Sequence, residues 1–257
     1  MISIQYPRYL SWKMALSKGK APETYFSSKA RKRIKKSFSL LDEAGYVFKK
    51  VKVDTLFLET FLPLYERLIG QKERGTIFDV KTSIQEGQQK GREYGAIALY
   101  NKEQTLQGAL LYSIREEALS SAYRVFPNDF ILPLPIGLGH VCEFLFFQEA
   151  MLQEKSFIFH GRDRNGYGKH SNIGLVEYKL RIGCLPFVSA SPQNEMLTLD
   201  AFSGNDELYF MGQGPNEPLK KSVLLSSSSE TVLYQTYPVL FDYQSVIGLE
   251  IIPYGPL

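Results

Sequence analysis

The chain has 257 residues, of which 44% are apolar and 22% are charged, and its formal net charge is +3. These values are typical of one globular domain, or of one domain with an appendage. No apolar run reaches the ~18 residues that a membrane-spanning helix needs, and the first twenty residues lack the apolar core of a signal peptide. We therefore expect a cytoplasmic protein with no transmembrane segment.

The first half of the chain predicts an arm followed by helices and strands. Residues 1–23 show no clear period and are expected to form an arm or loop. Residues 27–44 predict a helix that Ser27 or Ser28 caps and Gly45 ends, because apolar residues recur there at helical spacing. Further elements are a strand over 46–53, a helix that Asp54 caps with a stripe of Phe57, Phe61, Leu64, Tyr65 and Leu68, and a helix over 80–93 ending near Gly95.

The first of these helices carries a block of basic residues. Six cations fall within eight positions: Lys29, Arg31, Lys32, Arg33, Lys35 and Lys36. Such a block can hold phosphates or acidic lipid heads, or it can simply be a solvated helix face.

The next part of the chain predicts an antiparallel meander of strands. The expected elements are strands over 96–100, 106–115 and 119–126, a helix over 137–155, a strand over 157–160, a helix over 172–182, and a closing pair of strands over 187–190 and 196–199. The fold class is therefore an α/β layered, mixed but mostly antiparallel sheet flanked by helices. The expected domains are an N-terminal arm (1–26), one domain (27–202) and a C-terminal β-rich extension (203–257), with strand-like stretches at Thr231–Phe241 and Val246–Ile252.

Metal chemistry is not expected. The chain has two cysteines, Cys142 and Cys184, and three histidines. Neither cysteine has a second one at metal-ligand spacing, and Cys142 falls in an apolar segment typical of a core.

A glycine-containing segment, Leu134–Gly139, precedes the long apolar helix. Small residues let a backbone approach a ligand closely, and the amides of a helix's first turn suit a pyrophosphate. The segment resembles the Gln/Arg-x-x-Gly-x-Gly/Ala loop of the GNAT acyltransferase superfamily, with Leu134 in place of Gln/Arg. The resemblance implies coenzyme A contacts from Ile136, Gly137, Leu138, Gly139 and His140, and oxyanion or cofactor contacts from the backbone near Tyr123–Val125, Val125 included. A plain tight turn is the alternative.

A second segment, Asn172–Gly183, resembles the late Asn-x-x-Ala…Tyr-x-Lys-x-Gly-Phe helix of the same superfamily. There the tyrosine often protonates the departing thiolate, which implies that role for Tyr178. The spacing from Tyr178 to Gly183 is one residue longer than in the superfamily, and Cys184 stands where Phe is usual. A half-buried helical tyrosine is the alternative.

The polar run His160–His170 follows a strand, where α/β sheets usually present ligand groups. The run and the features after it resemble the FemAB-like branch of the superfamily, on Gly161, Arg162, Asp163, Tyr167, Gly168, Lys179, Gly183 and Pro186. Asp163 or His160 would accept the proton of an amine. The predicted substrate contacts are Arg162, Tyr167, Lys169, Lys179 and Glu143, although salt bridges within the fold would equally explain Arg162, Asp163 and Glu143. FemAB-like proteins usually hold two GNAT units, so this chain either acts alone or forms a homodimer.

Three functions remain open. The first is transfer of an acyl group from acyl-CoA, without a metal, to a small-molecule amine or a cell-envelope precursor by direct attack. The second is transfer from aminoacyl-tRNA, with the basic helix on phosphates. The third is a non-catalytic binding module of the same fold. The transferase assignment depends on a splayed sheet whose gap admits a long thioester-like donor, with the amides around 136–140 at its charged end.

Overall fold

A computed structural model describes residues 3–72, 76–190, 193–198, 204–212 and 217–253. The chain divides into two compact units. We call Ala15–Phe159 the central unit, and Met1–Met14 together with His160–Leu257 the terminal unit. The expected boundary at 202/203 begins outside the described residues, and the boundary at 26/27 stays a prediction.

The central unit contains the predicted meander. Its strands pair antiparallel in chain order: β3 (Val47–Lys52), β4 (Glu93–Tyr100), β5 (Leu106–Ile114) and β6 (Ala118–Val125). Strand β7 (Phe157–Arg164) begins in this unit and runs parallel to β6. Their ladder has three residue pairs and ends at Ser120 and Phe159. This mixed, mostly antiparallel arrangement confirms the expected fold class.

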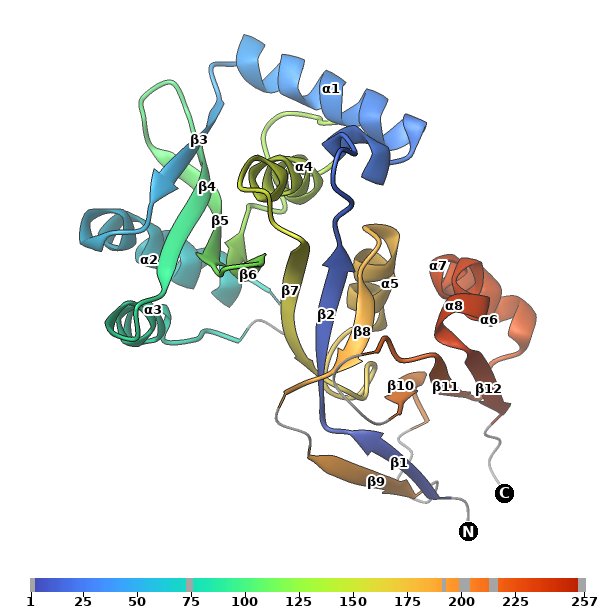
Figure 1. Ribbon diagram of the computed structural model, residues 1–257. Coiled ribbons are helices and arrows are strands. Elements are labelled where there is room, and N and C mark those ends of the chain that lie inside the picture. Colours follow the sequence, from blue (N-terminus) through green and yellow to red (C-terminus); the bar gives the residue numbers. More distant parts are fainter. Residues whose placement is uncertain (1–2, 73–75, 191–192, 199–203, 213–216, 254–257) are drawn as a thin grey trace. The chain divides into compact units, whose positions relative to one another are not determined.

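Helices cover both faces of the central sheet. These are the 3-10 helix η1 (Pro22–Tyr25) and the helices α1 (Ser28–Glu43), α2 (Thr55–Gly70), α3 (Val80–Gln89) and α4 (Leu138–Leu152). Figure 1 shows α1 and α4 on one side of the strands and α2 and α3 on the other. The predicted caps are confirmed: Ser27 Oγ accepts from the Ala30 amide at 3.2 Å and Asp54 Oδ1 from the Phe57 amide at 2.8 Å.

The predicted stripe of α2 forms the centre of a core. Phe57, Phe61, Leu64, Tyr65 and Leu68 are all buried. They belong to one cluster with buried side chains of α3, β4, β5 and β6. Burying a side chain of this size contributes about 1.5–3 kcal/mol, so this stripe holds α2 on the sheet.

The residues of the terminal unit that the structure describes form three groups of strands. Besides the second half of β7, the strands are β1 (Ser3–Pro7), β2 (Tyr9–Ala15, its last residue in the central unit), β8 (Leu185–Val188), β9 (Asn194–Thr198), β10 (Glu207–Met211), β11 (Lys221–Ser226) and β12 (Leu249–Pro253). Strand β2 lies between β7 and β8, β1 pairs antiparallel with β9, and β11 lies between β10 and β12.

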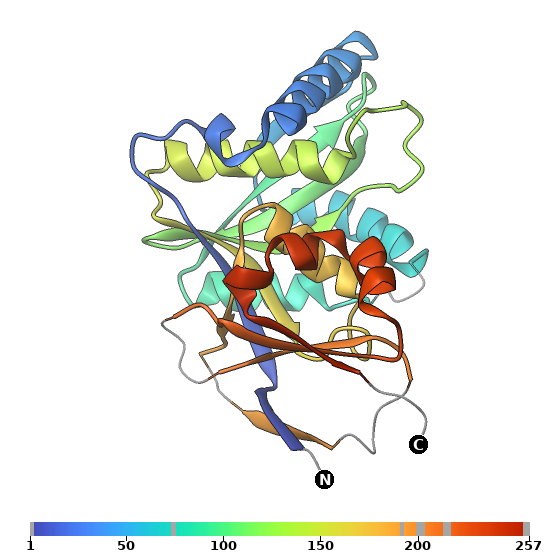
Figure 2. The ribbon, with the colours of Figure 1, turned by 90° about the vertical axis from the view of Figure 1, so that its right-hand side faces the viewer.

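Four helices complete the described part of this unit: α5 (Ile173–Arg181), α6 (Glu230–Thr236), α7 (Pro238–Asp242) and α8 (Gln244–Ile247). The last three connect β11 to β12, which run parallel. Figure 2 shows them beside α5, and the Glu177 carboxylate on α5 accepts from the Val239 amide at 3.0 Å. Within the described residues, no helix combines the length and apolar character needed to cross a bilayer.

Four expectations about elements were wrong. The arm is not a loop over 3–15, because Leu10, Trp12 and Met14 alternate with more exposed residues and form a strand. Residues 187–190 and 196–199 do not pair with each other: β8 pairs with β2 and β9 with β1, and Leu199 lies outside the described residues. The helix over 80–93 ends at Gln89, and Gly95 lies inside β4.

The fourth error concerns the expected strand over Thr231–Phe241, which is helical. Its aromatic and β-branched residues favour a strand. Pro238 nevertheless stands at the first position of α7, where its fixed φ suits a helix, and Leu233, Val239 and Leu240 are buried. Tertiary packing therefore outweighs the local strand propensity. Residues 246–247 likewise belong to α8, and the strand of that region begins at Leu249.

Candidate functional site

The first helical turn of α4 is the predicted phosphate site in the central unit. Gly137 is the N-cap in extended conformation, with φ −62° and ψ 152°, and no side chain of the described residues caps this end. A Cβ at Gly137 or at Gly139 would meet no atom within 4 Å. The first amides of a helix lack an i−4 carbonyl partner within the helix and carry partial positive charge. This end of α4 therefore offers polar N–H groups with open space around both glycines.

The neighbouring predicted residues of α4 are Ile136, Leu138 and His140. Leu138 is buried, whereas Ile136 and His140 are half-buried. The His140 amide donates to the Gly137 carbonyl at 2.9 Å, as in a tight first turn. The side chain of Leu138 therefore anchors the turn, and backbone groups around it are what a ligand would meet.

Strand β6 carries the other predicted part of this site. Val125 is fully buried and pairs with Ala109 of β5, and a register shift lies between Leu111 and Tyr112 opposite β6. Such irregularities re-aim backbone and side chains. The proposed oxyanion donors near Tyr123–Val125 thus belong to the strand whose chain continues into α4.

An ion pair of Glu143 joins α4 to β6. Its fully buried side chain accepts from Arg124 Nη1 at 3.2 Å, and the Arg124 side chain is 30% exposed. A buried carboxylate needs such a partner. Next to it, burial, and to a lesser degree the charge of Glu143, raise the pKa of the Cys142 thiol, which fits the expected core cysteine. The structure thus gives Glu143 a structural role, and a substrate role remains a prediction.

In the terminal unit, three predicted site residues contact one another. Asp163 Oδ2 accepts from Lys179 Nζ at 2.6 Å and from the Tyr167 hydroxyl at 2.9 Å. Sequence reasoning missed a fourth member, Trp12, whose indole N–H donates to the Tyr167 oxygen at 2.9 Å. The period-2 pattern Leu10, Trp12, Met14 was the signal that could have found it.

This network is enclosed. Trp12 and Tyr167 are fully buried, and the side chains of Lys179 and Asp163 are 6% and 13% exposed. Burial, followed by the charge of Asp163, raises the pKa of Tyr167 well above its ordinary value. To act as a base, Asp163 would have to give up an ion pair first. Its contacts are those of a residue that joins β7 to α5.

The remaining predicted residues of the terminal unit are spread over β7, α5 and a turn. Arg162 and Asp163 lie within β7 rather than in a loop after it, because the strand extends to Arg164. The Arg162 guanidinium lies 3.9 Å from the centre of the Tyr9 ring, a cation–π contact. His160 is buried in β7, Lys169 is exposed, and Tyr178 is half-buried on α5. The predicted residues therefore fall into two groups, one on each unit.

The six cations of α1 are exposed. In the described part of the chain none of them forms an ion pair, and the only side-chain bond among them joins Arg31 to Ser28 Oγ at 3.0 Å. Their charge is not neutralised by neighbouring carboxylates. The surface of α1 can therefore attract phosphates.

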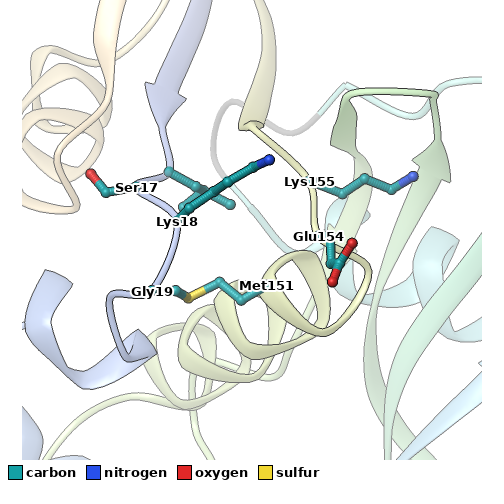
Figure 3. A pocket seen from close by; sticks show the side chains of 7 residues that line it. Ser17, Lys18, Gly19, Met151, Glu154 and Lys155 are labelled. Carbon is teal, nitrogen blue, oxygen red and sulfur yellow. The ribbon is translucent and has the colours of Figure 1, made fainter.

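A pocket of about 280 Å³ in the central unit was not predicted (Figure 3). It lies between the segment Leu16–Gly19 and the end of α4, with Met151 reaching toward Gly19. The Lys155 side chain points away from it (Figure 3), because its Nζ donates to the Glu116 carbonyl at 3.1 Å. Lys18 also lines this pocket and brings a positive charge to it.

Comparison with known proteins identifies the fold. No protein-family model and no curated protein matches the sequence. Among solved structures, FemX matches with a TM-score of 0.52 at 12% identity, over 73% of this chain and 61% of its own. L-PGS from Bacillus licheniformis gives 0.44 at 15% identity, over 62% of this chain and 46% of its own. A tandem GNAT protein from the clavulanic acid biosynthesis pathway gives 0.41 at 12% identity, over 70% and 50%.

The chain therefore has a GNAT-like fold of the FemX type. It spans about half to three fifths of the length of these structures. At such identities the likeness concerns the fold alone. An activity like that of those proteins is therefore only a proposal for this chain.

Proposed function

We propose that the protein transfers an acyl or aminoacyl group to an amine from a donor with a phosphate-bearing carrier, with acyl-CoA as the first choice. The observation that carries this proposal is the uncapped first turn of α4, with its open glycines, on a GNAT-like fold. The amides of the first turn would hold the pyrophosphate of coenzyme A. No metal is required for this chemistry.

The reaction would be a direct displacement. The lone pair of the amine attacks the thioester carbon, backbone amides near Tyr123–Val125 stabilise the oxyanion, and the C–S bond breaks to release the thiolate. The roles of Asp163 or His160 as proton acceptor and of Tyr178 as proton donor remain predictions from the sequence resemblance. The acceptor would be a small-molecule amine or a cell-envelope precursor, with the protein acting alone or as a homodimer in the cytoplasm.

The experiment is binding of coenzyme A to the purified chain and to two variants of one residue. G139E places a carboxylate in the first turn of α4, where it stabilises the helix but repels a pyrophosphate. G139A serves as the matched control, because an added Cβ meets no atom within 4 Å. We expect G139E to melt no earlier than the wild type and to bind coenzyme A at least about tenfold more weakly, or roughly 1.4 kcal/mol. Equal affinity of the wild type and G139E, or no binding by the wild type, would contradict the proposal.

A second candidate donor, aminoacyl-tRNA, is favoured by the unneutralised cations of α1. Each phosphate contact adds about 0.7–0.9 to the negative slope of log K against log salt. A triple variant of Lys32, Lys35 and Lys36 to Gln should therefore reduce the salt slope of tRNA binding by about 2–3, while coenzyme A binding changes little. A slope near zero in the wild type would leave acyl-CoA as the donor.

A further inference from the structure

A second pocket in the central unit is lined by none of the residues of α4, although its segment 126–131 precedes Gly137 in the chain. Its volume is about 610 Å³, within the range of about 300–1,000 Å³ typical of small-molecule sites. Its walls come from the C-terminal end of α2, the residue before β3, the start of β5 and the segment that leaves β6. Several separate elements thus contribute to one concave surface.

Two opposite charges line this pocket. Arg67 on α2 and Asp129 after β6 both belong to the lining, and both are exposed. Within the described residues neither makes an ion pair, with the other or with any third residue. The pocket therefore offers one cation and one anion whose charges are available to a ligand.

The polar lining is completed by three primary amides, from Gln71, Gln107 and Asn128. Each side-chain amide carries both donors and an acceptor. Gln107 uses one donor on the Thr105 carbonyl at 3.3 Å. These groups can serve carboxylate oxygens as well as ammonium protons.

The apolar lining includes three aromatic rings, which neighbouring residues hold in place. Tyr46 and Phe130 pack edge to face with ring centres 5.0 Å apart. Phe126 lies against the backbone of Gly108, where an added Cβ would come within 2.4 Å of its ring. Because Gly108 has no side chain, the Phe126 ring packs directly on its backbone and is held in position. The three rings can therefore contact an apolar side chain or an ammonium group.

The geometry points to a binding site for a small zwitterion that carries an apolar side chain, namely an amino acid or a dipeptide. The planar guanidinium of Arg67 binds the carboxylate in a fork. Asp129 binds the ammonium group, and the aromatic walls bind the side chain. The inference is independent of the proposed transferase activity, since it involves neither α4 nor a donor.

The test is titration by NMR of the full chain with three probes: L-phenylalanine, N-acetyl-L-phenylalanine, which lacks the ammonium group, and L-phenylalanine amide, which lacks the carboxylate. From the number of ligand atoms we expect a Kd on the order of 1 mM for L-phenylalanine. Glycyl-L-phenylalanine is the fourth probe, and its affinity relative to L-phenylalanine decides between a dipeptide and a free amino acid.

Two pocket variants and two control variants complete the design. R67Q should weaken L-phenylalanine about tenfold or more and leave the amide unchanged, whereas D129N should weaken L-phenylalanine and leave the N-acetyl compound unchanged. K90Q and E59Q remove exposed charges elsewhere on the central unit and should leave all affinities as in the wild type. The proposal is overturned if neither zwitterion binds at about 20 mM, well above the Kd expected for its size, or if R67Q and D129N bind like the wild type.

Discussion

The buried pair of Asp163 and Lys179 predicts a large loss of stability in D163N. Asparagine keeps the shape of the side chain but removes the charge opposite an ammonium group that is only 6% exposed. Removing one partner of a buried ion pair typically costs about 3–5 kcal/mol. K179M should cost less, because Asp163 would keep its bond from Tyr167 and the methionine would fill the space with apolar atoms.

The double variant D163N/K179M provides the decisive comparison. If the two groups stabilise the fold through each other, its loss should be smaller than the sum of the single losses by at least about 1 kcal/mol. Urea unfolding followed by the fluorescence of Trp12, the only tryptophan of the chain, measures this at the network itself. Losses that simply add, or a D163N loss within about 0.5 kcal/mol of zero, would refute the structural role and return Asp163 to the candidates for the base.

Three further predictions concern backbone, capping and pH. G168A should destabilise by about 2–4 kcal/mol or fail to fold, because Gly168 has φ +95° and a Cβ there would lie 1.9 Å from the Asp206 carbonyl oxygen; thermal unfolding measures this, and an unchanged Tm would contradict it. D54A should lose about 1 kcal/mol in urea unfolding by removing the cap on the Phe57 amide, and D54S should recover most of it. Burial, with a neighbouring carboxylate, raises the pKa of Tyr6 from 10.0 to about 12. The stability that this tyrosine contributes is therefore complete below pH 10 and is lost as the pH rises to 12. In urea unfolding, Y6F should flatten this fall by an amount on the order of 1 kcal/mol after solvent screening, and an equal fall in both proteins would contradict the assignment.

The central unit could be predicted well because its signals are local. The caps Ser27 and Asp54, the apolar stripe of α2 and the meander of β4, β5 and β6 all follow from spacing within about fifteen residues. The terminal unit depends on pairing across long stretches of chain. Strand β2 pairs with β8, more than 170 residues later, and neither segment contains a local sequence signal that identifies the other as its partner.

One buried residue shows why the terminal unit was difficult. The Asn165 side chain donates to the carbonyls of Pro7 and Phe210 and accepts from the Phe210 amide. It therefore joins three segments that lie far apart in sequence. In the sequence it is only one polar residue in a glycine-containing run, which is typical of a loop.

The candidate site residues also differ in how far the sequence could predict their roles. Sequence resemblance predicted Asp163 as a catalytic residue and Tyr167 and Lys179 as substrate contacts, whereas in the structure the Asp163 carboxylate accepts hydrogen bonds from both of the other side chains. Their contacts satisfy the requirement that buried polar groups be paired, which explains their presence without any ligand. Gly137 and Gly139 are different, because no atom of the protein occupies the space where their side chains would be and no side chain of the described residues caps the helix behind them. Packing does not require glycine at either position, and the open space around these amides leaves room for a phosphate to approach. The amide end of α4 is therefore the place where the transferase proposal should be tested first.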